Sequence, residues 1–288
     1  MTSPPSLPLE ALGRRWLTRA EAWADRSPWR GATYEFLWFG LKQGWACLFG
    51  GLMLVLIVGT FLLWPETAPI SRYDFLVVGA VAIQIGMLAL KLEGRDEAVV
   101  ILMFHIAGTV MELFKTAHGS WIYPEDSVLR IGAVPLFSGF MYAAVGSYIA
   151  RVQRVFHIRV RGYPPFWLTA VLAAAIYINF FAHHWLPDVR LALFAATVLI
   201  FGRGWFWFTT DRRRRRMPLL LGYLLVALFI WFAENLGTLA QAWTYPGQQA
   251  GWEMVGLEKL GSWFLLMIIS IVLVSIVRWP EVEPRDRP

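Results

Sequence analysis

Two acidic residues in apolar surroundings are the strongest candidates for chemistry. Glu112 begins "ELFKTAHGSWIYP" and Glu234 begins "ENLGTLAQAWTYP", so that Glu, Thr, Trp, Tyr and Pro recur in the same order and at the same spacing. An ionisable group inside a membrane helix is costly, and its presence indicates a functional site. When two carboxyl groups lie together, one can hold a proton while the other is ionised. The pair therefore predicts acid/base chemistry; the alternative is that each glutamate only hydrogen-bonds a neighbouring helix.

Polar side chains accompany both carboxyl groups. At about 100° per residue, His105 shares a helix face with Glu112, so we expect it to tune or relay the proton; the alternative is an imidazole that bridges helices. The equivalent position in the second segment is Ala227, which suggests that one carboxyl group donates a proton and the other receives it. The residues expected to bind substrate are the nearby hydroxyl, amide and aromatic side chains: Thr109, Thr116, Trp121, Tyr123, Ser138, Tyr142, Asn235, Thr238, Trp243 and Tyr245.

Four other residues in apolar segments permit two interpretations each. Asn179 and His183, one helical turn apart, either belong to the site or anchor a helix at the membrane surface. Arg203 either pairs with a carboxylate or head group, or extends toward the membrane surface along its Trp neighbours, which we favour. Pro135 either opens a helix to line a cavity or only kinks it.

Several chemistries are excluded by the sequence. A single cysteine, Cys47, rules out a disulfide within the chain and a cysteine-built metal site. The five histidines are scattered, and the zinc motif HExxH, a phosphate-binding glycine loop and a dinucleotide-binding motif are all missing. We therefore expect neither a metal nor another cofactor.

The elements that must position these residues are membrane helices. Of the 288 residues, 57% are hydrophobic and 16% are charged, whereas about a quarter of a soluble domain is charged. A helix needs about 20 apolar residues to cross a bilayer, and the sequence contains eight such segments. This predicts an all-α bundle of eight transmembrane helices. The segments are 45–64, 74–92, 97–117, 131–150, 165–185, 189–209, 218–241 and 257–277.

Arginine and lysine predict how the chain is oriented. Short cytoplasmic loops carry the excess of positive charge, and the basic stretches, including "DRRRRRM" at 211–217, all fall on one side of the eight segments. We expect a multi-pass protein of the bacterial inner membrane with both termini in the cytoplasm. The same rule explains the net charge of +6 without a nucleic-acid partner. The expected partners are membrane lipids and a lipophilic small molecule.

The doubled motif also predicts a doubled fold. A shift of 122 positions, the difference between Glu112 and Glu234, lays the first four apolar segments over the last four. An even number of spans gives parallel repeats, related by an axis along the membrane normal. Nine residues separate Trp121 from Glu112, or roughly 13 Å of helix, which predicts carboxyl groups near the membrane midplane below interfacial tryptophans. The expected units are a leader with an interfacial helix (1–33), two four-helix repeats (34–161 and 162–278) and a tail (279–288).

Two resemblances follow from these segments. "HIAGTVMELFK", "GSWIYPE" and "VPLFSGFMYAAVGSY" resemble the bacterial membrane-protein family named domain of unknown function 817, over about residues 35–278, and this resemblance implies no activity. A shorter stretch is similar to the membrane carotenoid cyclase and hydratase families, and the matching residues are Glu112, Gly119, Trp121, Tyr123, Pro135 and Leu136. That similarity implies acid-initiated chemistry on a carbon–carbon double bond, with aromatic faces stabilising the cation.

Three functions are consistent with this sequence. The favoured hypothesis is a cofactor-free enzyme that acts on an apolar lipid or isoprenoid, with Glu112 and Glu234 as acid and base. The second is a proton-coupled transporter, because paired carboxyl groups at a repeat interface also suit transport. The third is a membrane scaffold. A lateral opening between helices favours the enzyme, a water-filled path from both sides favours the transporter, and tightly packed glutamates favour the scaffold.

Overall fold

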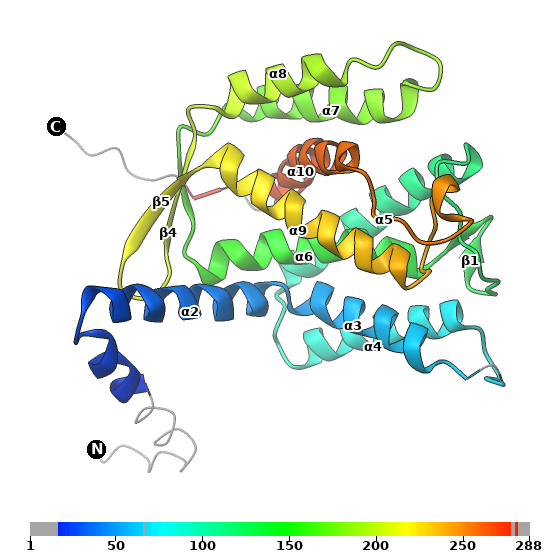
Figure 1. The fold of residues 1–288 in the computed structure, drawn as a ribbon. Helices are drawn as coiled ribbons and strands as arrows, with labels where there is room; N and C mark the ends of the chain where they lie inside the picture. Colours follow the sequence, from blue (N-terminus) through cyan, green and yellow to red (C-terminus); the bar gives the residue numbers. More distant parts are fainter. Residues whose placement is uncertain (1–16, 66, 278–279, 282–288) are drawn as a thin grey trace.

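The computed structural model describes residues 17–65, 67–277 and 280–281, and helices dominate this part of the chain (Figure 1). Residues 17–24 are helical but bear no label; residues 12–16 of the expected interfacial helix lie outside the described residues. The labelled helices are α2 (Pro28–Ala46), α3 (Leu48–Leu63), α4 (Arg72–Ala89), α5 (Arg95–Ala117), α6 (Phe137–Val155), α7 (Phe166–Ala182), α8 (Arg190–Phe201), α9 (Leu219–Leu239), α10 (Leu257–Val277) and the short 3₁₀ helix η1 (Pro246–Gln248).

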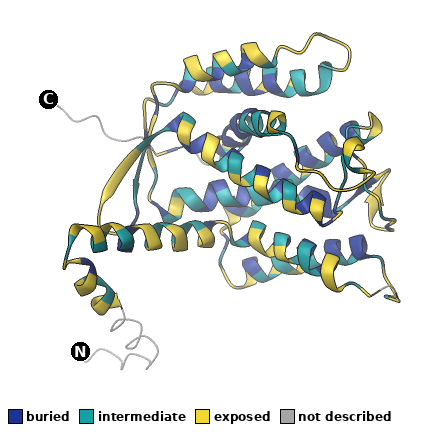
Figure 2. Ribbon diagram, viewed as in Figure 1, coloured by how far each residue is buried: buried dark blue, intermediate teal, exposed yellow. Residues whose placement is uncertain are grey.

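The long helices indicate a membrane protein. Four of them, α4, α5, α9 and α10, are long and apolar enough to cross a bilayer, and α2 with α3 could form a fifth span that is bent by 71°. Figure 2 shows exposed positions along the outer faces of the helices. Many exposed residues are large and hydrophobic, as expected for surfaces that contact lipid. The central helices α5, α6, α9 and α10 bury most of their inward faces in one core with α7.

Two of the eight predicted segments differ from the structure. Segment 189–209 is not one helix, because α8 ends at Phe201 and the chain continues into a strand. The 12 residues of α8 extend only about 18 Å, less than the roughly 30 Å hydrocarbon core of a bilayer. Segment 131–150 becomes helical only from Phe137. Pro135 precedes that helix, so the expected helix kink or opening at Pro135 is wrong.

Short strands replace loops at both ends of the bundle. β1 (Arg130–Ile131) pairs with β2 (Val134–Pro135), so Pro135 lies in a hairpin. At the other end, β3 (Arg159–Arg161), β4 (Trp205–Thr209) and β5 (Arg214–Pro218) form an antiparallel sheet in the order β3-β4-β5. The arginine-rich stretch predicted as a simple turn is therefore the hairpin between β4 and β5 and its second strand.

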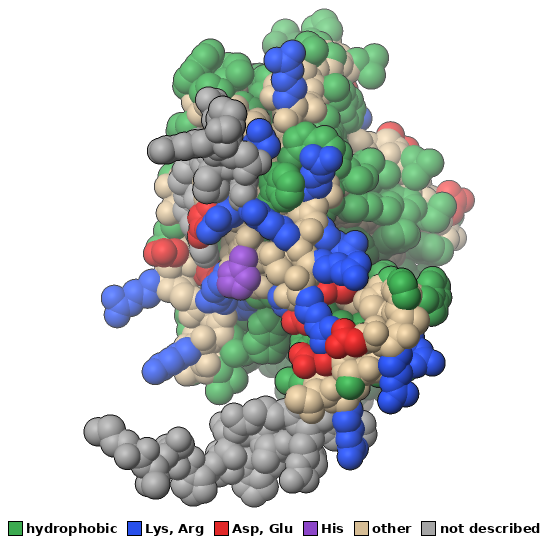
Figure 3. All heavy atoms as spheres, turned by 90° about the vertical axis from the view of Figure 1, so that its left-hand side faces the viewer, with side chains coloured by type: hydrophobic (Ala, Val, Ile, Leu, Met, Phe, Trp, Pro, Cys, Tyr) green, Lys and Arg blue, Asp and Glu red, His purple; other side chains and the backbone are tan. Residues whose placement is uncertain are grey.

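Side chains alternate between the two faces of β4, and the basic strand β5 packs beside it. Phe206 and Phe208 face the bundle, where their rings pack on Tyr223 (5.6 Å) and Phe156 (6.1 Å). The intervening Trp207 carries the guanidinium of Arg214 over its ring at 5.1 Å. Figure 3 shows lysine and arginine side chains, mixed with acidic ones, across this end of the molecule. We call it the basic end, and the opposite end, formed by residues 118–129 and 240–256, the loop end.

Candidate functional site

Glu112 and Glu234 occupy equivalent places at the loop ends of two helices. Each lies five positions before the last residue of its helix, Ala117 in α5 and Leu239 in α9. Their side chains are buried, with 3% and 4% of the residue exposed. Two positions beyond the end of each helix the backbone takes a positive φ, 66° at Gly119 and 52° at Gln241. This left-handed residue reverses the chain after a helix, so the following Trp and Tyr run back toward the carboxyl group.

Three hydrogen-bond donors hold Glu112. Trp121 Nε1–H and the Tyr123 hydroxyl both donate to Oε2, each at 2.7 Å. The Tyr142 hydroxyl, from α6, donates to Oε1 at 2.8 Å. A carboxylate can accept several such bonds, so this arrangement satisfies both oxygens of a buried Glu112.

Two donors of the same kinds hold Glu234. The Tyr245 hydroxyl donates to Oε1, at the same sequence separation as Tyr123 has from Glu112. The indole donor is Trp263 Nε1–H of α10, at 2.8 Å from Oε2. The predicted indole, Trp243, instead packs on α9 at Gly237, where any side chain would clash with its ring. Each carboxyl group thus has one tyrosine from its own loop and one aromatic donor from the neighbouring helix.

The helical distance used to predict the depth of the carboxyl groups differs from the structure. The 13 Å estimate assumed that the chain continues along the helix axis from Glu112 to Trp121, but the turn at Gly119 brings the indole back to the carboxyl group. Glu112 lies five positions from the end of α5, or about 8 Å along the axis. Glu112 therefore lies slightly nearer the loop end of α5 than its middle, and Glu234 lies midway between the middle of α9 and its loop end.

The two loops that carry the motif contact each other. Ile122 and Thr244 form an antiparallel bridge, with backbone N–H to O=C bonds of 3.0 and 2.9 Å. The rings of Trp121 and Tyr245 meet edge to face at 6.1 Å. Lys259 Nζ lies over both rings, 4.2 Å from the centre of Tyr245 and 6.0 Å from that of Trp121. The donors of Glu112 and those of Glu234 consequently form one continuous aromatic cluster.

A cavity of about 40 Å³ lies on the bundle side of this cluster, among α5, α6, α7, α9 and α10. Tyr142 and Trp263 both form part of its wall, and their ring centres are 6.4 Å apart. Most of the remaining wall is apolar, including Phe104, Met111 and Met267. The cavity therefore brings an apolar space into contact with one donor of each carboxyl group.

The tyrosines in the two loops are held in their neutral form. Burial raises the pKa of Tyr123 well above the usual value for a phenol, and the negative charge and hydrogen bond of Glu112 raise it further. Burial and the neighbouring Glu234 raise the pKa of Tyr245 in the same way. Both hydroxyls therefore keep their protons at neutral pH and can donate to a carboxyl oxygen.

Several predicted site residues lie elsewhere. His105 packs on the ring of Phe140 (4.7 Å) and is not among the groups that hydrogen-bond Glu112. Trp243 packs on Gly237, as noted. Ser138 is fully buried beside the first residue of α6. Trp121, Tyr123, Tyr142 and Tyr245, which were predicted to bind substrate, therefore hydrogen-bond the carboxyl groups themselves, whereas these three do not. Ser138 and Trp243 lie beside the hydroxyls of Tyr123 and Tyr245 instead.

The polar residues predicted on α5 and α9 mainly bond to the backbone. Thr109 and Thr116 donate to carbonyl oxygens one turn back, those of His105 and Glu112. Thr238 donates to Asn235 O and accepts from Trp252 Nε1. Asn235 Oδ1 accepts from Val255 N, which fixes the loop that leads into α10. Asn235 and Thr238 thus position the second loop rather than face the carboxyl group.

The three undecided residues lie outside the two carboxyl sites. Asn179 donates to Asp188 and accepts from Val189 N, so it shapes the loop between α7 and α8. His183 ends α7 and contacts the backbone of Asn179. Arg203 lies next to β4 at the basic end and is exposed. The described residues contain no group of three or more His, Cys, Asp or Glu side chains arranged to hold a metal ion.

Trp263 was not predicted as a hydrogen-bond donor to Glu234. The 122-residue shift pairs Tyr142 with Phe264, one position after Trp263. A search for aromatic donors one position away from the repeat partner would have found it. Lys259 was not among the predicted site residues, although its ammonium lies over rings from both loops.

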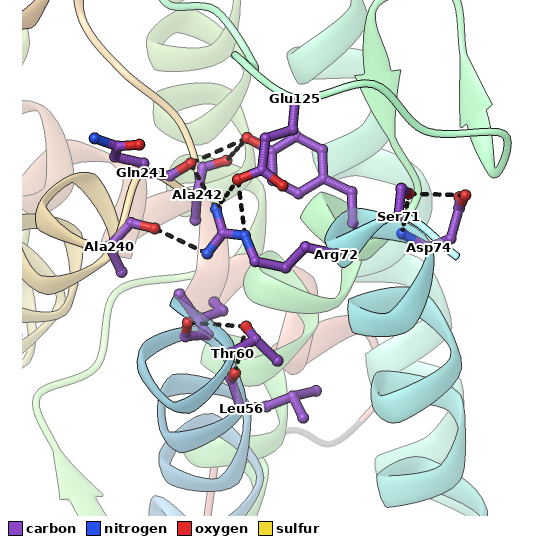
Figure 4. A network of polar contacts seen from close by, with 11 residues as sticks. Leu56, Thr60, Ser71, Arg72, Asp74, Glu125, Ala240, Gln241 and Ala242 are labelled. Atoms are coloured by element: carbon purple, nitrogen blue, oxygen red, sulfur yellow. Dashed lines mark hydrogen bonds and ion pairs between the residues drawn. The ribbon is translucent and has the colours of Figure 1, made fainter. Parts of the chain in front are cut away.

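A buried arginine from α4 holds the end of α9 in place (Figure 4). Arg72 Nη1 donates to Ala240 O and Nη2 to Gln241 O, each at 3.0 Å. Its Nε donates to Glu125 at 2.8 Å, and the two side chains form an ion pair. Because helix ends leave carbonyl oxygens without partners, Arg72 stabilises the reversal that returns Tyr245 to Glu234.

Comparison with known proteins gives a family without an activity. Residues 35–271 match the family described as "Protein of unknown function (DUF817)". The uncharacterized protein YoaT of Bacillus subtilis (strain 168) is 40% identical over 247 residues, which cover 86% of this chain and 93% of the relative. No solved structure matches the chain. These matches do not show the likeness to carotenoid cyclases and hydratases, which stays a hypothesis.

Proposed function

We propose a function for this chain from one premise, that it belongs to the DUF817 family of proteins of unknown function, and from the geometry of its carboxyl groups. The protein is a membrane enzyme whose two glutamates act as acid and base on an apolar lipid or isoprenoid. The observation that carries this proposal is the cavity wall: Tyr142 bonds Glu112, Trp263 bonds Glu234, and both face the same apolar cavity.

The proposed chemistry needs no oxidant or reductant. In the proposed step, protonated Glu112 donates its O–H to the Tyr142 oxygen, and the Tyr142 hydroxyl turns from Glu112 toward the cavity. Tyr142 passes its own proton to one carbon of a double bond and takes the proton of Glu112, so that a C–H bond forms and a carbocation remains. The aromatic rings around the cavity stabilise that cation. Glu234 in its ionised form removes a proton from a neighbouring carbon, and the electrons of that C–H bond form a new double bond. The product is an isomer of the substrate, and proton return between the two glutamates restores the enzyme.

The fold proposed for this enzyme is a bundle of eight helices in two repeats, which are units 34–161 and 162–278. Several features support it. Helices α5 and α9 end at residues related by the 122-position shift, and α3 packs on α6 as α7 packs on α10. Ile122 pairs with Thr244, its own equivalent, in an antiparallel bridge. Pairing of equivalent residues is what a two-fold axis produces.

We place this enzyme in the bacterial inner membrane with the basic end, and hence both termini, in the cytoplasm. The support is the distribution of arginines: Arg159, Arg161 and the run at 212–216 all lie at one end. Positive residues in short loops favour the cytoplasmic side.

The test compares apolar lipids and pigments from a deletion strain that carries either the intact gene or the Glu112→Gln, Glu234→Gln double variant. We expect one apolar compound to accumulate with the double variant and to be consumed when the intact protein is present. Glu253→Gln, a change at an exposed residue of the loop end, is the control and should behave as the intact protein. Identical profiles for intact protein and double variant, with both present in the membrane, would contradict the proposal.

A second candidate is a proton-coupled transporter. It is favoured by the contact between the two carboxyl sites, because transporters bind substrates and protons where two repeats meet. Purified protein in sealed vesicles distinguishes the two functions. A transporter would acidify or alkalise the vesicle interior when a solute gradient is applied, whereas the enzyme would convert a lipid without moving protons across the membrane. The scaffold hypothesis predicts neither result.

A further inference from the structure

A buried lysine beside the carboxyl sites has no acidic partner. Lys115 lies in the last turn of α5, and only 4% of the residue is exposed. Its Nζ contacts His184 Nε2 at 3.3 Å and lies 4.2 Å from the ring centre of Phe180. No carboxylate of the described residues forms an ion pair with it. Burial of a charge is costly unless it is paired and hydrogen-bonded, and an ammonium has three protons to donate.

The surroundings of Lys115 are also positive. Lys259 and Arg190 act on it electrostatically as like charges, and Asp188 acts on it as an opposite charge. Asp188 already binds Arg190 through an ion pair of 3.2 Å and a backbone N–H. Glu234 and Glu258 act electrostatically on Lys259 as opposite charges. Among the described residues, the acidic groups of this region are thus engaged by Arg190 and Lys259, and Lys115 forms no ion pair with any of them.

Three histidines lie between the buried Lys115 and the surface of the loop end. The ring of His184 stacks on His118 at 4.9 Å and lies 4.3 Å from His183. His118 and His184 are exposed, so a ligand that approaches from the loop end meets imidazole groups first and the buried ammonium behind them. We call Lys115, His118, His184, Arg190 and Lys259 the cationic cluster.

Aromatic residues connect the cationic cluster with the cavity. Phe114, next to Lys115 in α5, packs on Phe181 of α7 at 4.6 Å. Phe181 in turn packs on Tyr177 at 4.7 Å, and Tyr177 forms part of the cavity wall. An apolar seam between α5 and α7 therefore leads from the buried ammonium to the space beside Tyr142.

We propose that the cationic cluster binds the anionic head group, a phosphate or carboxylate, of an amphiphile whose apolar chain lies along the α5–α7 seam. Lys115 and His184 contact the head group directly. This inference rests on the proposed function, because it assigns the substrate to anionic lipids or isoprenoids, and it adds a binding site outside the carboxyl pair.

The test measures thermal unfolding of the full chain in a neutral detergent with added dodecyl phosphate. A ligand at ten times its dissociation constant raises the unfolding midpoint by about 3 °C for a protein of this size. We expect that rise for the intact protein and its loss in Lys115→Met. Arg130→Met, which removes an exposed positive charge at the same end, is the matched control and should keep the rise. His184→Phe retains the stacked ring and serves if Lys115→Met does not fold.

Two further ligands test whether the protein recognises the anionic head group, the apolar chain or both. Inorganic phosphate alone should give little stabilisation, and a full shift with it would overturn the assignment to an amphiphile. Dodecyltrimethylammonium has the chain with the opposite charge; an equal shift with it would overturn recognition of an anion. A shift that persists in both Lys115→Met and His184→Phe would overturn the site itself.

One variant separates this inference from the proposed function. The Glu112→Gln, Glu234→Gln double variant lacks the proposed acid and base but retains the cationic cluster, so it should still respond to dodecyl phosphate. Binding that is retained while lipid profiles stay unchanged in the strain comparison would overturn the enzyme and support the head-group site. Loss of binding in the double variant would contradict a separate site.

Discussion

At the scale of single residues, each carboxyl group is defined by its donors. Trp121, Tyr123 and Tyr142 surround Glu112, and Tyr245 and Trp263 surround Glu234. The sequence identified both glutamates and four of these five donors as site residues, three of them because the motif repeats at a fixed spacing. Trp263 was missed, since the choice of Trp263 rather than its neighbour Phe264 depends on how α9 and α10 pack.

Removal of the Trp121 donor should destabilise the protein. Trp121→Phe keeps most of the ring but leaves Glu112 Oε2 with one donor fewer. Loss of a hydrogen bond to a buried charged group costs about 1–3 kcal/mol. The measurement is the thermal unfolding midpoint of the detergent-solubilised protein. Trp185→Phe, at a residue that is 67% exposed, is the control and should change stability by less than about 0.5 kcal/mol. Equal effects of the two changes would contradict the assigned hydrogen bond.

Alkaline titration should reveal the two loop tyrosines. Their pKa values are raised above those in the unfolded chain, so the folded state holds these protons more tightly. Their contribution to stability is fully present below about pH 10, the unfolded tyrosine pKa, and is lost as pH rises beyond it. Phenolate absorbance near 295 nm should therefore rise late and together with unfolding. In Tyr123→Phe fewer phenols should titrate late, and an unchanged late phase would show that Tyr123 is not among them.

At the scale of elements, helix positions were more predictable than their ends. α5 and α10 match the predicted segments 97–117 and 257–277 closely, because long apolar runs define them. The sequence did not predict β4 and β5. The aromatic run of β4 was interpreted as part of a span and the basic run of β5 as part of a turn. The return of Trp121 to Glu112 was also missed, because a turn of a few residues changes a distance along the axis into a direct contact.

Contact between α5 and α6 should depend on Gly108. A Cβ there would lie 2.5 Å from Cγ of Tyr142, so Gly108→Ala must displace the tyrosine that donates to Glu112. Overpacking of this kind typically costs about 1–3 kcal/mol. Gly86→Ala is the matched control, because a Cβ there meets no atom within 4 Å, and it should stabilise α4 by roughly 0.5–1 kcal/mol. Thermal unfolding of both variants measures the difference, and stabilisation by Gly108→Ala would contradict the described packing.

At the scale of the whole molecule, the proposed orientation places the basic end in the cytoplasm and the loop end outside. Replacement of Cys47 by Ala gives a background without cysteine. Single cysteines are then placed at Val128, which is 87% exposed at the loop end, and at Arg213 in the β4–β5 hairpin. The cells are converted to spheroplasts, whose inner membrane is intact and accessible. A membrane-impermeant thiol reagent should then label Val128→Cys and should label Arg213→Cys only after the membrane is permeabilised. The reverse pattern would contradict the orientation.

The most direct measurement of the central claim, that the two glutamates form an acid and a base, is the infrared carbonyl band of protonated carboxyl groups in the purified protein at neutral pH. Because Glu112 is the proposed acid and Glu234 the proposed base, we predict that Glu112→Gln removes a band of a buried protonated carboxyl group and that Glu234→Gln leaves this band in place. If neither variant removes a band, both glutamates are ionised anchors for their tyrosine and tryptophan donors. If each removes its own band, both are protonated; either result contradicts the acid/base pair.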